Sequence, residues 1–262
     1  MPLDAGFTLR EVTYSRMEAY CKGLLQDGLK PATVNRRMSA IGTAMTQCVK
    51  KGWLPSRPLL PHYAENNIKE RYLTKAEEKA ILDAFEKFVK RDAALVHYEY
   101  TLVRDLALLL LDSGVRFSEA FKFKLDSDGH LNLEHGETKN SKGRRVPLTK
   151  RAIKAATTLL ASRKYKELQV MEGKKPWDYC AHRWQTVTKI AGCPEVTLHI
   201  LRHTTASRLV QKGIPIYDVS KWLGHSSVRI TERYAKLAPD SLGKALAALE
   251  EDWRGTRYRG RV

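Results

Sequence analysis

The sequence predicts a mainly α-helical protein that contains one small antiparallel β-sheet. Apolar residues recur at helical spacing in most segments of the 262-residue chain. Residues 130–149 differ, because apolar and polar residues alternate there in runs that a turn can join as a hairpin. Residues 54–71 hold three prolines and show no clear period, which is typical of a linker. A helical first domain and a larger second domain are therefore expected.

The first domain is expected at residues 1–62 and is built from two helices. Residues 15–28 place apolar side chains on one face, and Gly28 follows as a helix stop. Residues 30–52 repeat the pattern, with Pro31 at an early helix position where its missing N–H is tolerated.

Net charge is the most informative bulk property. The chain has 46 Lys and Arg against 29 Asp and Glu, a net charge of +17 and a pI near 9.7. Such an excess favours a polyanionic partner, most often nucleic acid, although a merely basic protein stays open. The polar side of the second helix carries Asn35, Arg36 and Arg37. With this charge, DNA contact is favoured there over a merely solvated face.

Other bulk features exclude several classes of protein. There is no run of 18 or more apolar residues, and the N-terminus lacks the basic-then-apolar layout of a secretory signal. A cytoplasmic protein without a membrane span is therefore expected. The four cysteines form no CxxC pair, and Cys180, His182 and Cys193 match no common zinc spacing. Reduced, buried thiols are favoured over a metal site.

The second domain is expected at residues 72–262, after a linker at 63–71. Its first helix starts at Thr74, which a glutamate follows three residues later in the capping-box pattern. A strongly apolar helix over residues 102–111 comes next, then the hairpin, and helices resume after it.

Two segments of this domain hold polar residues beside a helix end and in the hairpin turn. Arg116 lies just past the apolar helix, and Glu119 follows three residues later. A surface ion pair would give the same pattern. Lys139 and Lys142 lie in the turn between the strands, where a solvated basic turn is the plain alternative.

Two further segments hold histidines, an arginine and a tyrosine. His199 and Arg202 are three residues apart and share one face of a helix, with His203 expected to be a structural neighbour. A short helix then ends at a glycine turn that carries His225, and Tyr234 is expected on the next helix. Each pattern is weak when taken alone.

Taken in order, these segments resemble the catalytic domain of tyrosine site-specific recombinases, the phage integrase family. The motifs are Gly-Val-Arg-Phe-Ser-Glu at 114–119, Lys139 ahead of Val-Pro-Leu at 146–148, His-Ile-Leu-Arg-His at 199–203, Leu-Gly-His at 223–225, and Tyr234. The match covers about residues 72–240, and LKPATVNRRMSAI in the first domain is similar to the family's core-binding domain. The ordered set on a basic chain makes the resemblance specific.

The resemblance implies an enzyme that cuts and rejoins DNA through a covalent 3′-phosphotyrosyl intermediate, with Tyr234 as the nucleophile. It implies that Arg116 and Arg202 bind the non-bridging phosphate oxygens. Lys139 is expected to protonate the leaving oxygen, with Lys142 as the competing general acid. The other expected site residues are His199 near the tyrosine proton, His225 on the phosphate, and Glu119 orienting the site.

The resemblance also implies the partners. Double-stranded DNA is the substrate, a tetramer on paired sites is the expected assembly, and accessory DNA-bending or directionality proteins are further partners. No metal and no cofactor are expected. The residues expected to contact DNA are Asn35, Arg36, Arg37, Lys142, Arg144 and Arg145. The expected role is the integration or excision of a phage or mobile element, in the cytoplasm of a bacterial or phage-infected cell.

Three other functions stay open on the sequence. Two share the chemistry: an Xer-like resolvase and a type IB topoisomerase-like enzyme. The third is a non-catalytic DNA-binding regulator, which is disfavoured because binding alone needs no tyrosine within such a set. The first domain is short for this family and no arm-type DNA-binding domain is visible, so a truncated form is a further alternative.

Overall fold

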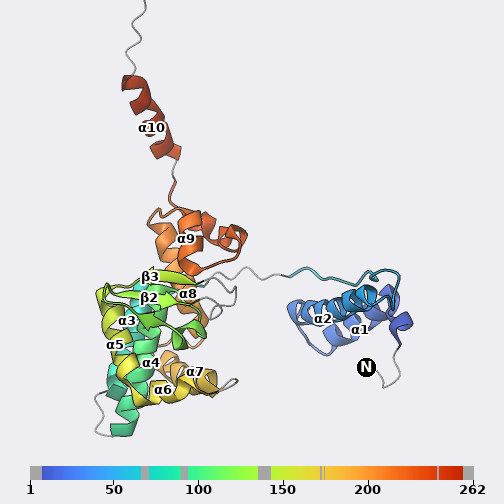
Figure 1. Cartoon of the computed structure of the whole chain (residues 1–262), viewed down its shortest axis with the longest axis horizontal. Coiled ribbons are helices and arrows are strands. Elements are labelled where there is room, and N and C mark those ends of the chain that lie inside the picture. Colours follow the sequence, from blue (N-terminus) through green and yellow to red (C-terminus); the bar gives the residue numbers. More distant parts are fainter. Residues whose placement is uncertain are drawn as a thin grey trace, which may run out of the picture. The chain divides into compact units, whose positions relative to one another are not determined.

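The chain divides into two compact units, Met1–Lys69 and Glu70–Val262, which are described separately (Figure 1). The computed structural model describes residues 8–65, 71–89, 94–134, 143–171, 173, 175–240 and 242–255. Mostly helical structure with one small antiparallel sheet is observed, so the predicted fold class is confirmed. Among the described residues, no helix combines the length and the apolar content that crossing a membrane requires.

The first unit is a small helical body. Its elements are η1 (Leu9–Glu11), α1 (Tyr14–Gln26) and α2 (Pro31–Lys50). Met17 and Cys21 of α1 pack with Val34 and Met38 of α2 in one buried cluster. The segment after α2 returns along the unit, and Leu60 packs against the same cluster. The two predicted helices are thus present, and their apolar faces make one core.

The second unit is built around the apolar helix α4. Its elements in chain order are α3 (Lys75–Val89), α4 (Ala94–Ser113), η2 (Glu119–Phe121), β1 (Lys124–Leu125), β2 (His130–Leu133), β3 (Arg144–Pro147), α5 (Lys150–Ala161), α6 (Arg163–Gln169), α7 (Lys175–Ile190), α8 (Leu198–Gln211), α9 (Ile216–Leu223), η3 (Val228–Ile230), η4 (Glu232–Leu237) and α10 (Leu242–Gly255). Helix α4 packs against α3, α5, α7 and α8 (Figure 1). Its leucines are therefore buried on nearly every side, which explains their density in the sequence.

The start of α3 follows the predicted capping box. The Thr74 hydroxyl accepts a hydrogen bond from the Glu77 backbone N–H at 3.1 Å, and the Glu77 carboxylate accepts from the Thr74 backbone N–H at 2.9 Å. Two backbone donors that a helix start leaves without a partner are thereby satisfied.

The sheet has three antiparallel strands in the order β1-β2-β3. Leu131 pairs with Val146, and both side chains are buried on the face that packs against the helices. Because side chains alternate along a strand, Arg144 and Arg145 point to opposite faces of β3. The two-residue strand β1 was not predicted, since two residues are too few to show an alternating pattern.

Candidate active site

Arg202 is the structural centre of the site. Its side chain is buried, with 5% of the residue exposed, on helix α8. Its guanidinium donates to the backbone carbonyl of Gly114 at 2.5 Å and to that of Leu223 at 2.7 Å. These carbonyls close α4 and α9, and a cation at a helix C-terminus is electrostatically favourable. Burial, and then the charges of Arg116 and Arg144, lower the pKa of Arg202 to about 9.

Glu119 is a buried carboxylate that forms ion pairs with two arginines of the site. The residue is 1% exposed, and its carboxylate accepts from the Arg116 backbone N–H and guanidinium, each at 2.8 Å. It also accepts from the Arg144 guanidinium at 2.7 and 3.3 Å. Burial by itself would raise the pKa of Glu119, but its bonds to Arg144 and Arg116 outweigh burial and hold the pKa below its ordinary value. A buried carboxylate therefore orients the arginine that is expected to meet the phosphate.

Arg144 lies inside the site, although we expected it to contact DNA. Only 10% of its side chain is exposed, and its guanidinium lies over Gly224 as well as on Glu119. A Cβ at Gly224 would come within 2.3 Å of Arg144 Nη1, and the φ of +66° at Gly224 also favours glycine. The expectation was wrong in placing Arg144 with Arg145, because the strand alternation turns Arg144 inward. Arg145 is half-exposed and binds Asp126 and Asp128 at 2.9 and 2.7 Å.

His225 lies on the turn that follows Gly224. Its Nδ1 is 2.7 Å from the hydroxyl of the buried Thr231. Burial, and then the charges of Arg202, Arg116 and Arg144, lower the pKa of His225 to about 4. The imidazole is therefore neutral at pH 7, in a form that can both donate and accept a hydrogen bond.

This depressed pKa predicts a pH dependence of stability. The unfolded imidazole has a pKa of about 6.5, so between about pH 6.5 and 4 the unfolded chain binds more protons than the folded one. The contribution of His225 is complete above this window and is lost as the pH falls through it. We expect the urea midpoint to fall less between pH 7 and 5 in His225→Gln than in wild type. His182→Gln, at an exposed histidine of the same unit, is the control; an unchanged slope in His225→Gln would contradict the prediction.

Tyr234 is buried, with 3% of the residue exposed. It lies on a helix after the turn, as expected, and this is the 3-10 helix η4; its ring packs with Val210, Val219 and Leu223. Its hydroxyl is hydrogen-bonded to Nδ1 of His203.

The two histidines of α8 are placed differently. His203 is half-buried beside Tyr234, whereas His199 is one turn earlier and exposed, with its ring edge-on to His203 at 4.7 Å between centroids. Partial loss of water around the His199 ring, and then Arg202, Arg116 and Arg233, lower its pKa. Sequence reasoning treated His203 as a structural neighbour. The four-residue spacing of the two histidines was the signal that both face one side of the helix.

The structure thus gathers most of the predicted site residues in the second unit. Arg116, Glu119, Arg202 and His225 form one charged cluster, which Arg144 joins. Tyr234 and the two histidines lie along the adjoining face of α8. Lys139 and Lys142 lie outside the described residues.

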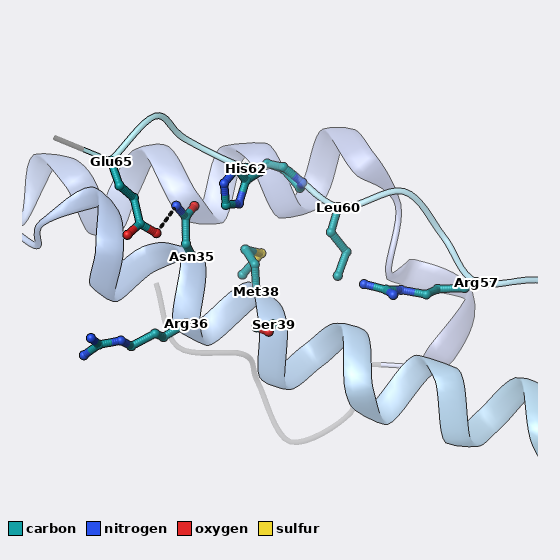
Figure 2. Close-up of a pocket in the computed structure, with 9 residues that line it drawn as sticks. Asn35, Arg36, Met38, Ser39, Arg57, Leu60, His62 and Glu65 are labelled. Atoms are coloured by element: carbon teal, nitrogen blue, oxygen red, sulfur yellow. Dashed lines mark hydrogen bonds between the residues drawn. The ribbon is translucent and has the colours of Figure 1, made fainter. Parts of the chain in front are cut away.

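A second candidate surface is a pocket of the first unit, between α2 and the segment that follows it (Figure 2). Its cavity is about 350 Å³, and its lining includes Arg36, Ser39, Arg57 and His62. Among the described residues, neither Arg36 nor Arg57 makes an ion pair with a carboxylate. The Arg57 guanidinium lies against the backbone of α2 at Gly42, where a Cβ would meet it at 2.5 Å.

Asn35 closes this pocket instead of facing solvent with Arg36 and Arg37. The residue is 7% exposed. Its amide donates to the Glu65 carboxylate at 2.7 Å (Figure 2). The same amide donates to the Tyr63 carbonyl at 2.8 Å, and the amide oxygen accepts from the Tyr63 N–H at 3.0 Å. The expectation that it lies on the exposed face was therefore wrong, because its hydrogen-bonding groups hold the following segment to α2.

Possible metal ligands approach one another at a single place in the described ranges. Ligand atoms of Asp126, Asp128 and His130 lie within 4.8 Å of one another. Arg145 pairs with both carboxylates, so the group forms a surface ion-pair cluster. The four cysteines are buried free thiols, and burial raises the pKa of Cys180 to about 12.

Comparison with known proteins identifies the family of the chain. The family model described as Phage integrase family matches residues 71–240. Transposase B from transposon Tn554 of Staphylococcus aureus is 23% identical over 93% of this chain and 41% of its own length. The integrase of Escherichia phage P2 is 26% identical over 90% of this chain and 65% of its own. Tyrosine recombinase XerA of Thermococcus kodakarensis is 32% identical over 66% of this chain and 60% of its own.

Solved structures of similar fold include two recombinases bound to DNA. The Tn1549 transposon integrase with a circular intermediate DNA has a TM-score of 0.63 at 18% identity, covering 93% of this chain and 86% of that one. XerH site-specific recombinase bound to palindromic difH has a TM-score of 0.61 at 20% identity, covering 93% and 74%. Several of the curated relatives are longer: the chain spans 41% of the Tn554 transposase.

Proposed function

The chain belongs to the phage integrase family, and from this premise we propose that it is a site-specific DNA recombinase. It breaks and rejoins DNA strands through a covalent bond between Tyr234 and a 3′-phosphate. A phosphotyrosyl bond keeps the energy of the phosphodiester, so that a second strand can be joined without another energy source. The reaction inserts or removes a phage or mobile element in a bacterial or phage-infected cell.

The observation that carries the proposal is the gathering of cationic groups beside the tyrosine. Arg202 and Arg116 lower the pKa of His225, and Arg202 interacts electrostatically with Tyr234. Glu119 pairs with Arg116 and Arg144, and Arg202 donates to backbone carbonyls instead, so positive charge remains in excess in this cluster. A phosphate diester supplies the negative charge that such a cluster lacks.

The mechanism follows from the charge that develops on the phosphate. In the transition state the non-bridging oxygens carry increased negative charge, and guanidinium groups held in place beforehand stabilise it. Arg116 offers part of its guanidinium to the phosphate while Glu119 holds the remainder. Neutral His225 donates a further hydrogen bond to the phosphate, and the positive charge of buried Arg202 stabilises the same oxygens.

The leaving 5′-oxygen needs a proton as the P–O bond breaks. We assign this step to Lys139, with Lys142 as the competing group, on the resemblance of the hairpin motif. His199 is assigned to the exposed edge of the site, where it contacts the DNA near the phosphate.

The remaining assignments extend the proposal to partners. The first domain, proposed at residues 1–62, is a core-type DNA-binding module joined by a linker at 63–71 to the catalytic domain at 72–262. Helix α10 exposes Leu246 and Leu249, at 58% and 65%, which supports docking on a neighbouring subunit of a tetramer. Accessory DNA-bending or directionality proteins complete the proposed assembly, which acts in the cytoplasm.

The test uses duplexes that the protein itself has selected from a random-sequence pool. The selected duplexes are nicked at successive positions, so that cleavage releases a short strand and traps the adduct. We expect a covalent band on a denaturing gel, and digestion should leave a nucleotide on a tyrosine. Tight binding without an adduct at any nick position would favour a non-catalytic regulator.

Binding should be steeply salt-dependent, because the chain neutralises several phosphates. Replacing Arg36 or Arg57 by Gln should reduce the slope of log K against log salt by about 0.9 for each phosphate that the variant no longer neutralises. Fluorescence anisotropy between low and moderate salt measures this slope. Lys22→Gln is the matched control, since its ammonium already pairs with Glu18 at 3.0 Å. If Arg36→Gln and Arg57→Gln keep the slope of wild type and of Lys22→Gln, the pocket is excluded as a phosphate-binding surface.

A further inference from the structure

We propose that His203, rather than His199, exchanges a proton with Tyr234 during cleavage and rejoining. The inference rests on the proposed function, because it assigns the tyrosine proton within that reaction. It concerns a residue that the sequence motif left without a chemical role.

The geometry places His203 directly on the reacting atom. Its Nδ1 is hydrogen-bonded to the Tyr234 hydroxyl, and the two ring centroids are 5.8 Å apart. The tyrosine is 3% exposed, so water has little access to its hydroxyl. Burial disfavours a charged phenoxide in general, and a base in contact with the hydroxyl can take its proton as the bond to phosphorus forms.

The packing of α8 against η4 maintains this contact. The Tyr234 ring is held by Val210 and Val219, from the second half of α8 and from α9. His203 lies one residue after Arg202, whose two hydrogen bonds to backbone carbonyls orient that turn of α8. The packing of α8 therefore holds His203 in place, the packing of η4 holds Tyr234 in place, and the hydrogen bond joins the two elements.

His199 is placed for a different task. It is exposed and contacts His203 edge-on, one turn closer to the N-terminus of α8. An exposed imidazole beside Arg116 and Arg202 suits contact with the DNA phosphate. The half-buried His203 suits transfer of a proton that must not be lost to water.

The proton and electron pairs balance in both directions. In cleavage, the Tyr234 hydroxyl oxygen forms a bond to phosphorus, its proton passes to Nδ1 of neutral His203, and the P–O5′ bond breaks as the 5′-oxygen takes a proton from the general acid. In rejoining, the 5′-hydroxyl attacks phosphorus and gives its proton back to the deprotonated general acid, the phosphotyrosyl bond breaks, and imidazolium His203 returns its proton to Tyr234.

The proposal predicts an acid limb in the rate of adduct formation, because protonated His203 cannot accept the tyrosine proton. Titratable groups around it are His199 on α8, Tyr234 on η4 and His225 on the turn after α9. The pKa of His225 is about 4, so it does not titrate between pH 5.5 and 8.5. His199, whose pKa is lowered by partial loss of water and by Arg202 and Arg116, contacts His203 and therefore needs its own variant.

The first experiment measures single-turnover adduct formation on the nicked duplexes between pH 5.5 and 8.5. We expect His203→Gln to be about 100-fold slower at pH 7.5 and to lose the acid limb, as loss of a general base does. His199→Gln should keep the acid limb whatever its rate. Loss of the limb in His199→Gln, with its retention in His203→Gln, would overturn the proposal. No adduct from wild type would instead contradict the proposed function.

A second experiment needs no DNA and is independent of that function. 3-Fluorotyrosine is placed at position 234, and its ¹⁹F resonance is followed in wild type, His203→Gln, His203→Leu and His199→Gln. We expect both substitutions of His203 to shift the resonance more than His199→Gln does, and the wild-type resonance to report the titration of His203. Circular dichroism verifies folding. A resonance insensitive to His203 but sensitive to His199 would overturn the assignment.

Discussion

Tyr234→Phe is expected to abolish the covalent protein–DNA adduct while DNA binding and folding stay close to wild type. The substitution removes one atom, the hydroxyl oxygen that attacks phosphorus, so no nucleophile remains. The ring keeps its packing against Val210, Val219 and Leu223. Loss of the hydrogen bond to His203 should lower the unfolding free energy by only about 0.5–1.5 kcal/mol.

The measurement compares wild type and variant on the same nicked duplexes, by denaturing gel for the adduct and by anisotropy for binding. Tyr217→Phe is the matched control, since Tyr217 is on neighbouring α9 and is 57% exposed. It should form adduct as wild type does. An adduct that persists in Tyr234→Phe would show that another residue is the nucleophile.

Glu119→Gln is expected to have the second large effect, on stability and on cleavage together. Glu119 is the buried carboxylate that two arginines share, and its charge also favours protonated Arg202. Without that charge, the neighbouring guanidiniums of Arg116 and Arg144 repel one another. Breaking a buried ion pair from one side costs about 3–5 kcal/mol. Cleavage should slow as well, because Arg116 loses the group that orients it.

Urea unfolding at several pH values measures this effect. The pKa of Glu119 is lowered in the folded state, so its contribution is present above the ordinary value of about 4.3 and is lost as the pH falls through the folded value. The difference in unfolding free energy between wild type and Glu119→Gln should therefore become smaller as the pH is lowered. Glu86→Gln is the control, because Glu86 is 46% exposed and its pair with Arg104 should contribute less than about 1 kcal/mol. Equal losses in the two variants would contradict the prediction.

Local sequence patterns predicted the structure correctly where the pattern lies within one helix. The helix start at Thr74 follows from a side chain and a backbone three residues apart, which the sequence displays directly. The apolar stretch at 102–111 lies within α4, the helix that the second unit surrounds. The ordered motifs also identified the family, which the match over residues 71–240 confirms.

Errors arose where a residue's role depends on a partner distant in the chain. Asn35 is a polar residue of the kind found on an exposed helix face, but its side chain is hydrogen-bonded to Tyr63 and Glu65. Arg144 and Arg145 are adjacent and identical, and only the pairing of β2 with β3 separates a buried arginine from an exposed one.

The sequence by itself determined the helical fold class, the family and the residue types of the site, because periodicity, caps and spaced motifs act over a few residues. Tertiary structure alone decided which groups touch. Glu119 meets Arg144 across 25 positions of the chain, and Tyr234 meets His203 across 31 positions. Such contacts depend on how helices and strands pack, and packing is a property of the whole core rather than of any local pattern.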